Sequence, residues 1–203
     1  MNIEDIRNSG LPGQLDGQML IAMPGMDDPR FARSVVYLCA HSEDGAMGII
    51  VNRRTRNLAM ADLLVQIGVI TREESRGLPT HVLELPVLYG GPVETSRGFV
   101  LHSTDFIVEN STLLIAGNVG LTVTMDILKA LSRGEGPESA VLALGYASWS
   151  AGQLEREMAT NVWLNGMPDD DIILGLDLES KYDRALGLIG IDPTFLSQEA
   201  GRA

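Results

Sequence analysis

The sequence predicts a single-domain α+β fold in which helices flank a compact mixed β-sheet, and a sheet that is barrel-like in part is an open alternative. Strand-like and helix-like segments are interspersed along the 203 residues, and some neighbouring strands are spaced as hairpins. Apolar residues make up 45% of the chain and charged residues 21%, which suits one large buried core. Because no repeat, low-complexity tract or linker interrupts the chain, we expect residues 1–203 to form one domain.

Three strands are expected first. Residues 18–23 form an apolar run closed by Pro24-Gly25, and residues 34–40 are rich in β-branched and aromatic side chains. The turn-forming residues 42–45 lead into a third run over residues 46–52. The second and third strands should therefore form a hairpin.

The middle of the chain alternates helix and strand patterns. Apolar residues at helical spacing predict a helix over residues 58–67, ending at Gly68. Further strands are expected, and a helix capped by Thr124 should stop at Gly134. These strands cover residues 82–89, 98–102 and 112–116. A buried strand is expected over residues 140–144, ended by Gly145.

Two helices are expected toward the C-terminus. Ser150 and Gln153 have the spacing of a capping box, which predicts a helix over residues 153–159 with Ser150 at its N-cap. A second apolar stripe predicts a helix over residues 182–189 after a Ser180 cap.

Charge and cysteine content narrow the classes of function. The formal net charge is −12, so the field of the molecule repels nucleic-acid phosphates and anionic lipid, and we expect no direct sequence-specific DNA binding. The acidic N-terminus and the lack of a run of about 18 apolar residues indicate neither a signal peptide nor a membrane span. With Cys39 as its one cysteine, the chain suits a reducing compartment, and we predict a cytoplasmic location.

Cys39 and His41 form the most reactive pair in the sequence. Alternate strand residues point to one face, so this thiol and imidazole are expected on the same side. A zinc site needs about three or four ligands, and His81 and His102 lie at no ligand spacing, so we predict no metal. Two interpretations stay open: a buried, inert cysteine, or an enzyme that uses Cys39 as nucleophile with His41 or His102 as base.

Phosphate-binding motifs are missing from the sequence, and one basic cluster is present. Neither the dinucleotide fingerprint nor the P-loop pattern occurs, so no cofactor is predicted. Residues 52–56 read Asn-Arg-Arg-Thr-Arg, which either binds phosphate or carboxylate groups of a partner or is a solvated loop.

Several segments carry a family resemblance. The matching pieces are residues 19–24, 28–31, 34–36, 45–53, 90–93, 101–103, 145–157 and 161–164. Together they resemble the YqgE/AlgH family of bacterial proteins over nearly the whole chain. Two departures are Arg54, where the family often has proline, and Ser148, where it commonly has glycine. The resemblance implies a compact mixed α/β fold and a cytoplasmic protein, with one branch named as a transcriptional regulator of alginate production in pseudomonads.

No catalytic constellation is complete, so we predict a non-enzymatic binding or regulatory protein that affects transcription indirectly. Its partner would be an unidentified protein or small ligand. The candidate surface is a strand–turn–helix corner over residues 145–157 beside the turn at residues 90–92. The candidate residues are Asn52, Arg53, Gly90, Gly91, Gly145, Trp149, Gln153 and Glu157. The competing interpretation is structural: Trp149 packs in the core and Ser150 only caps the helix.

Overall fold

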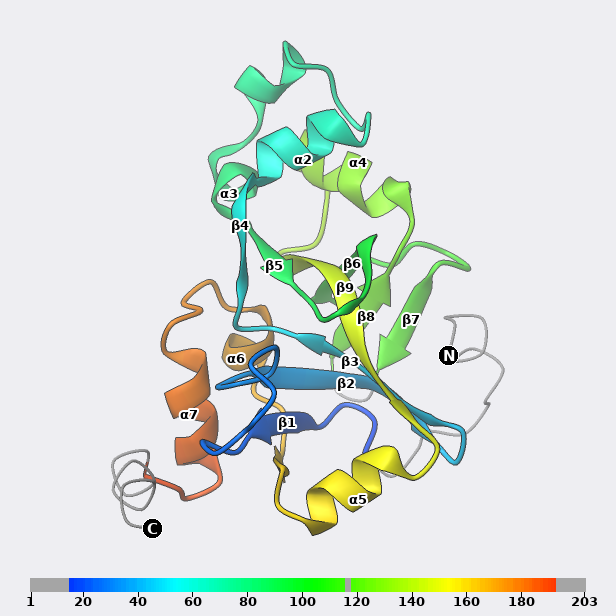
Figure 1. The fold of residues 1–203 in the computed structure, drawn as a ribbon. Helices are drawn as coiled ribbons and strands as arrows, with labels where there is room; N and C mark the ends of the chain where they lie inside the picture. Colours follow the sequence, from blue (N-terminus) through cyan, green and yellow to red (C-terminus); the bar gives the residue numbers. More distant parts are fainter. Residues whose placement is uncertain (1–14, 116–117, 193–203) are drawn as a thin grey trace.

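The computed structural model describes residues 15–115 and 118–192 and shows a curled β-sheet with helices on its faces (Figure 1). Ten described strands hydrogen-bond into one sheet, with the main path β10-β1-β2-β3-β9-β6-β8-β7. Every pair is antiparallel except β5 with β9. The structure confirms the mixed α+β class, and the sheet curls into a half-barrel.

The elements follow one another in this order. The strands are β1 (Met19–Ala22), β2 (Val35–Ser42), β3 (Gly45–Ile50), β4 (Arg54–Ala59), β5 (Pro86–Tyr89), β6 (Val93–Ser103), β7 (Thr112–Ile115), β8 (Val119–Thr122), β9 (Ala140–Ser150) and β10 (Trp163–Gly166). The helices are α2 (Met60–Gln66), α3 (Thr80–Glu84), α4 (Met125–Arg133), α5 (Gln153–Ala159), α6 (Asp170–Leu174) and α7 (Lys181–Leu188), with a 3₁₀ turn, η1 (Glu74–Gly77).

Strand β9 joins the two parts of the sheet. Its first half pairs with β6 and β5, and its second half, residues 147–150, pairs with β3. Gly145 lies between the halves with a positive φ of 74°. The expected strand over 140–144 is therefore correct, but the prediction that Gly145 ends it is wrong. Glycine tolerates this backbone conformation inside the strand, so pairing resumes beyond it.

The first three strands form as predicted, and both of their faces are covered. Along β1, Met19 and Ile21 face the core beneath α6 and α7, whereas Leu20 and Ala22 face the core beneath α5. A third core lies under α2, α3 and α4, at the other end of the sheet (Figure 1). Burial on both faces explains why these strands are continuously apolar rather than alternating.

Several predicted boundaries are wrong. Residues 54–59 form β4, so the helix expected over 58–67 begins only at Met60. The strand expected over 82–89 is split into α3 and β5, because Pro86 cannot continue a helix but can open a strand. Strand β6 is longer than the expected 98–102, with a register irregularity between Val93 and Gly98. Strands β8 and β10 and helix α6 were not predicted.

The predicted capping residues occupy different roles in the structure. Gly152, in the left-handed region, is the N-cap of α5, so the assignment of Ser150 is wrong. The reciprocal half of the box does form, since the Ser150 backbone N–H donates to Gln153 Oε1 at 3.0 Å. Thr124 and Ser180 precede their helices as expected, but neither side chain caps.

Lys181 begins α7 and is completely buried. Its ammonium donates to the carbonyl oxygens of Val51, at 3.0 Å, and Ile173, at 3.2 Å, and so connects α7 to the end of β3 and to α6. Tyr182 adds a bond from its hydroxyl to the Ala22 carbonyl at 2.7 Å. Burial lowers the pKa of Lys181 to about 7. In the described part of the chain, no helix is long and apolar enough to cross a membrane.

The buried lysine predicts a pH-dependent stability. The unfolded chain keeps the Lys181 proton up to about pH 10.5, whereas the folded chain releases it near pH 7. Between these values the unfolded state binds more protons, so the free energy of unfolding should rise with pH, by up to about 1.4 kcal/mol per pH unit from this group. Urea denaturation at pH 7, 8 and 9 should show this rise in the wild type and a smaller one in Lys181→Met. Parallel profiles for the two proteins would contradict it.

Candidate functional site

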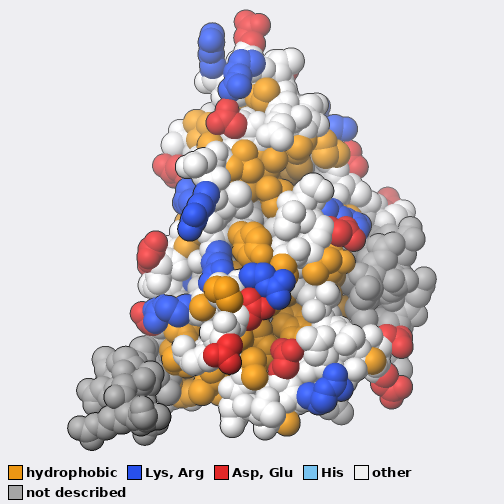
Figure 2. All heavy atoms as spheres, in the orientation of Figure 1, with side chains coloured by type: hydrophobic (Ala, Val, Ile, Leu, Met, Phe, Trp, Pro, Cys, Tyr) orange, Lys and Arg blue, Asp and Glu red, His pale blue; other side chains and the backbone are white. Residues whose placement is uncertain are grey.

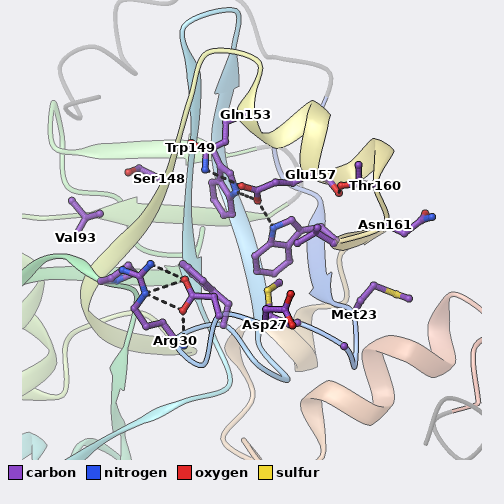
Figure 3. Close-up of a pocket in the computed structure, with 17 residues that line it drawn as sticks. Met23, Asp27, Arg30, Val93, Ser148, Trp149, Gln153, Glu157, Thr160 and Asn161 are labelled. Atoms are coloured by element: carbon purple, nitrogen blue, oxygen red, sulfur yellow. Dashed lines mark hydrogen bonds and ion pairs between the residues drawn. The ribbon is translucent and has the colours of Figure 1, made fainter. Parts of the chain in front are cut away.

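A cleft of about 730 Å³ opens beside α5, where several distant segments of the chain converge (Figure 3). Its walls come from the loop after β1, the start of β6, the end of β9, α5 and the connection from α5 to β10. On the face shown in Figure 2, hydrophobic side chains are exposed above α5 and are bordered by acidic and basic groups. The volume is in the range of small-molecule and peptide sites.

Three aromatic side chains form one wall of the cleft. The Trp149 and Trp163 rings meet edge to face with centroids 5.7 Å apart, and Phe31 meets Trp163 in the same way at 5.6 Å. Trp149 and Trp163 are 5% and 3% exposed, so only their edges reach the cleft, whereas Phe31 is half-buried. Such pairs add to the stability gained from burial alone.

Glu157 holds the two tryptophans together. One carboxylate oxygen accepts from Trp149 Nε1 at 2.9 Å and from Trp163 Nε1 at 2.8 Å. The other oxygen accepts from Gln153 Nε2 at 2.8 Å. Both indole N–H groups therefore have an acceptor, and all three donors to the Glu157 carboxylate are neutral groups (Figure 3).

Asn52 and Arg53 anchor the loop that carries Phe31. Asn52 accepts from the Val35 backbone N–H and donates to the Arg33 carbonyl, both at 2.8 Å. The Arg53 guanidinium donates to the carbonyl oxygens of Pro29, Arg30 and Ala32, the shortest contact being 2.5 Å to Ala32. The Arg53 donors are thus used inside the protein, and Arg54 and Arg56 are the exposed arginines of the cluster.

The charged rim of the cleft contains one ion pair. Arg30 binds both carboxylate oxygens of Asp28, with a shortest distance of 2.7 Å. This hydrogen bonding holds the pKa of Asp28 below its usual value. The Arg30 guanidinium also lies 5.9 Å from the Phe31 ring centroid. Asp27, next to this pair, is exposed at the rim.

The three candidate glycines allow two backbone segments to touch behind the cleft. A Cβ on Gly90 would lie 2.2 Å from the Gly145 carbonyl oxygen, and one on Gly91 would lie 2.1 Å from the Tyr146 carbonyl carbon. A Cβ on Gly145 would in turn lie 2.5 Å from the Gly91 carbonyl oxygen. The turn at residues 90–92 therefore lies against the corner at 145–157, and Pro92 is part of the cleft wall.

The structure separates Cys39 from His41. A β-bulge between Leu38 and Ala40 reverses the side-chain alternation, which corrects the expectation that the two share one face. Cys39 is buried in the core beneath α6 and α7, where burial raises the pKa of its thiol. His41 points to the other face, where Nε2 is 2.6 Å from Glu155 Oε1. This geometry gives the cysteine-nucleophile alternative no support.

Sequence reasoning missed part of the cleft. Phe31, Asp27 and Trp163 were not among the candidate residues, although Trp163 is the second of only two tryptophans in the chain. The rarity of tryptophan in this chain, with a glutamate nearby in the sequence, was the signal that could have pointed to Trp163. A second cleft of about 570 Å³ is bordered by His81 and Asp105. Within the described residues, no group of three or more possible metal ligands gathers.

Comparison with known proteins places this architecture among relatives. A family model described as AlgH-like matches residues 19–194. A UPF0301 protein of Beijerinckia indica is 57% identical over 203 residues, which cover all of this chain and 98% of the relative. A UPF0301 protein of Methylobacterium nodulans is 56% identical, with 98% of each chain covered.

Solved structures show the same fold. The solution structure of the AlgH protein from Pseudomonas aeruginosa has a TM-score of 0.72 and 38% identity, and the match covers 92% of this chain and 95% of that one. A crystal structure of a Corynebacterium diphtheriae protein has a TM-score of 0.62 at 20% identity, covering 87% and 90%. The latter is a likeness of fold alone.

The neighbouring arginines 53 and 54 provide a matched test of the loop anchor. Arg53→Ala should lower the free energy of unfolding by about 1–3 kcal/mol, because half-buried carbonyl groups lose their donors. Arg54→Ala should change it by less than about 0.5 kcal/mol, since Arg54 is exposed. Chemical denaturation of the two variants checks this, and equal effects would contradict the anchoring role.

Replacing Glu157 tests the connection between the tryptophans. Glu157→Ala leaves the N–H groups of Trp149 and Trp163 without their acceptor and should cost about 1–3 kcal/mol of stability. Glu157→Gln, the control, keeps one carbonyl oxygen as an acceptor and should cost less. Denaturation followed by tryptophan fluorescence measures both. If the two variants lost the same stability, the shared carboxylate would not be the stabilising feature.

Proposed function

This chain belongs to the AlgH-like family, as the sequence resemblance indicated, and on this premise we propose that it is a non-enzymatic binding or regulatory protein. Its ligand or partner occupies the cleft beside α5. The observation that carries the proposal is the cleft itself, which has an aromatic wall and supporting side chains already fixed by internal hydrogen bonds. A preformed cleft needs little ordering when it binds.

The chemistry of the lining supports binding rather than catalysis. Within the described part of the chain, the lining holds neither histidine nor cysteine. Its carboxylates are Asp27, Asp28 and Glu157, of which Asp28 is paired with Arg30 and Glu157 with the indole groups. The Thr160 hydroxyl donates to helix carbonyls. These groups position one another and leave no nucleophile–base pair in contact.

A regulatory role would be exerted through a partner in the cytoplasm rather than by reading DNA. The net charge of −12 opposes binding to a phosphate backbone. Arg53, which the sequence offered as a phosphate ligand, donates to backbone carbonyls instead. The regulatory function that the family resemblance implies is therefore proposed to act indirectly.

A variant that fills the cleft tests this proposal. Ser148 is an exposed strand residue in the cleft wall, and Ser148→Trp should fill the space while leaving the thermal midpoint nearly unchanged. The control is Leu114→Trp, at a strand position 62% exposed and outside the cleft lining. Affinity capture from the native cells, with native mass spectrometry for small ligands, should show a bound species that is lost only from Ser148→Trp.

The opposite result is equally clear. If wild type, Ser148→Trp and Leu114→Trp retain the same bound proteins and small molecules in equal amounts, the cleft is not the binding site. The proposal would then fail.

A further inference from the structure

The cleft carries an excess of negative charge that the protein does not neutralise. Asp28 is neutralised by Arg30, but the carboxylate of Glu157 is bound only by neutral N–H groups. Asp27 lies exposed at the rim, and no described residue forms a hydrogen bond or ion pair with it. Two of the four charged groups of the lining are thus carboxylates without a cation, on a protein whose net charge is −12.

The aromatic wall provides a second feature that suits a cation. Phe31, Trp149 and Trp163 meet at this wall, and Phe31 is the least buried of the three rings. The negative face of such a ring attracts guanidinium and ammonium groups. The protein's own Arg30 shows the arrangement, with its guanidinium 5.9 Å from the Phe31 centroid and both Asp28 oxygens as acceptors. A second guanidinium could adopt the same combination of ring and carboxylate with Asp27.

The remaining lining suits an apolar chain beside that cation. Met23 and Val93 line the cleft beside the aromatic wall (Figure 3), and Met26 belongs to the same lining. Methionine side chains adapt to irregular apolar shapes and are frequent at surfaces that bind peptides. A volume of about 730 Å³ exceeds what one alkyl ammonium or guanidinium group fills, so an occupant of several residues fits better than a free amine.

We propose that the cleft binds an exposed peptide segment of a basic protein partner and receives an arginine or lysine side chain between the aromatic wall and Asp27. This inference rests on the proposed function, because it names the class of occupant for the same cleft. The charge on Asp27 and Glu157 gives specificity for the cation, and the negative field of the whole protein speeds the encounter with a basic partner. The charge of Arg30 is balanced by Asp28, which accepts from its Nε and Nη2 groups.

Selection of peptides on the full-length chain tests the proposal without knowledge of the partner. A phage-displayed library of random peptides is selected on the wild type and, in parallel, on Ser148→Trp, which fills the cleft. We expect the sequences specific to the wild type to share an arginine or lysine flanked by apolar residues. The best peptide is then synthesised with arginine or with citrulline, which has the same shape but no charge.

Binding of the synthetic peptides is measured by fluorescence anisotropy. The citrulline peptide should bind about tenfold more weakly, as the loss of one cation–π contact and one ion pair predicts. Asp27→Asn should weaken the arginine peptide about threefold or more, and this effect should shrink as salt screens the pair. Asp62→Asn is the matched control, because Asp62 is an exposed aspartate of α2 outside the cleft lining, and it should leave the affinity unchanged.

Three results would overturn the inference. The first is a selection that yields no wild-type-specific peptides with a shared basic residue. The second is a citrulline peptide that binds as tightly as the arginine peptide. The third is arginine amide that binds as tightly as the peptide, which would make the occupant a small molecule. These outcomes leave the proposed function standing if Ser148→Trp still loses a native ligand. If nothing native depends on the cleft, the proposed function fails as well.

Discussion

The contact of Gly90 and Gly91 with the backbone around Gly145 is the constraint on which the two parts of the sheet depend. Here the chain leaving β5 passes so close to β9 that a single added Cβ would lie little more than 2 Å from a backbone atom. The same contact lets Ile50 donate to the Gly90 carbonyl at 2.8 Å, where β3 takes over the pairing of β9 from β5. Any larger side chain would have to push the two parts of the sheet apart, and backbone atoms cannot rotate out of the way as a side chain could.

The cleft follows from this junction. Beyond Gly145, β9 continues far enough to place Trp149 over the face that α5 covers, and the chain after α5 returns to place Trp163 beside it. Two buried indole N–H groups then need acceptors, and one carboxylate oxygen of Glu157 accepts from both. Arg53 satisfies carbonyl groups of the loop that carries Phe31. The aromatic wall is preformed because its indole N–H groups and the loop carbonyl groups have partners within the protein, so the ligand does not have to supply them.

The sequence was sufficient where local patterns determine structure. The apolar strands β1 to β3 and helices α2, α4 and α7 were predicted because each buries a continuous run or a stripe at helical spacing, and α5 was predicted from capping-box spacing. Sequence reasoning failed where tertiary contact overrides such patterns. Gly145 looks like a strand end but is a junction, and the bulge at Cys39 reverses the faces of the residues after it. The sequence also brought the corner and the 90–92 turn together, but it could not show that Arg53 points inward or that Phe31 crosses over to Trp163.

These roles divide the residues of the site into two groups with different consequences. Asn52, Arg53, Gln153 and Glu157 use their polar groups on the protein itself, so a substitution among them acts on the shape and stability of the cleft. Four other side chains of the lining form no hydrogen bonds that hold the cleft together: Met23, Asp27, Val93 and Ser148. Substitutions at these positions should change what the cleft binds while the fold persists. The second group should therefore determine what the cleft binds. The shape of the cleft can be varied at Ser148 and its charge at Asp27, each without the other. Residues 145–157 contain both kinds of residue, because the strand that builds the wall of the cleft must also pass through the glycine junction.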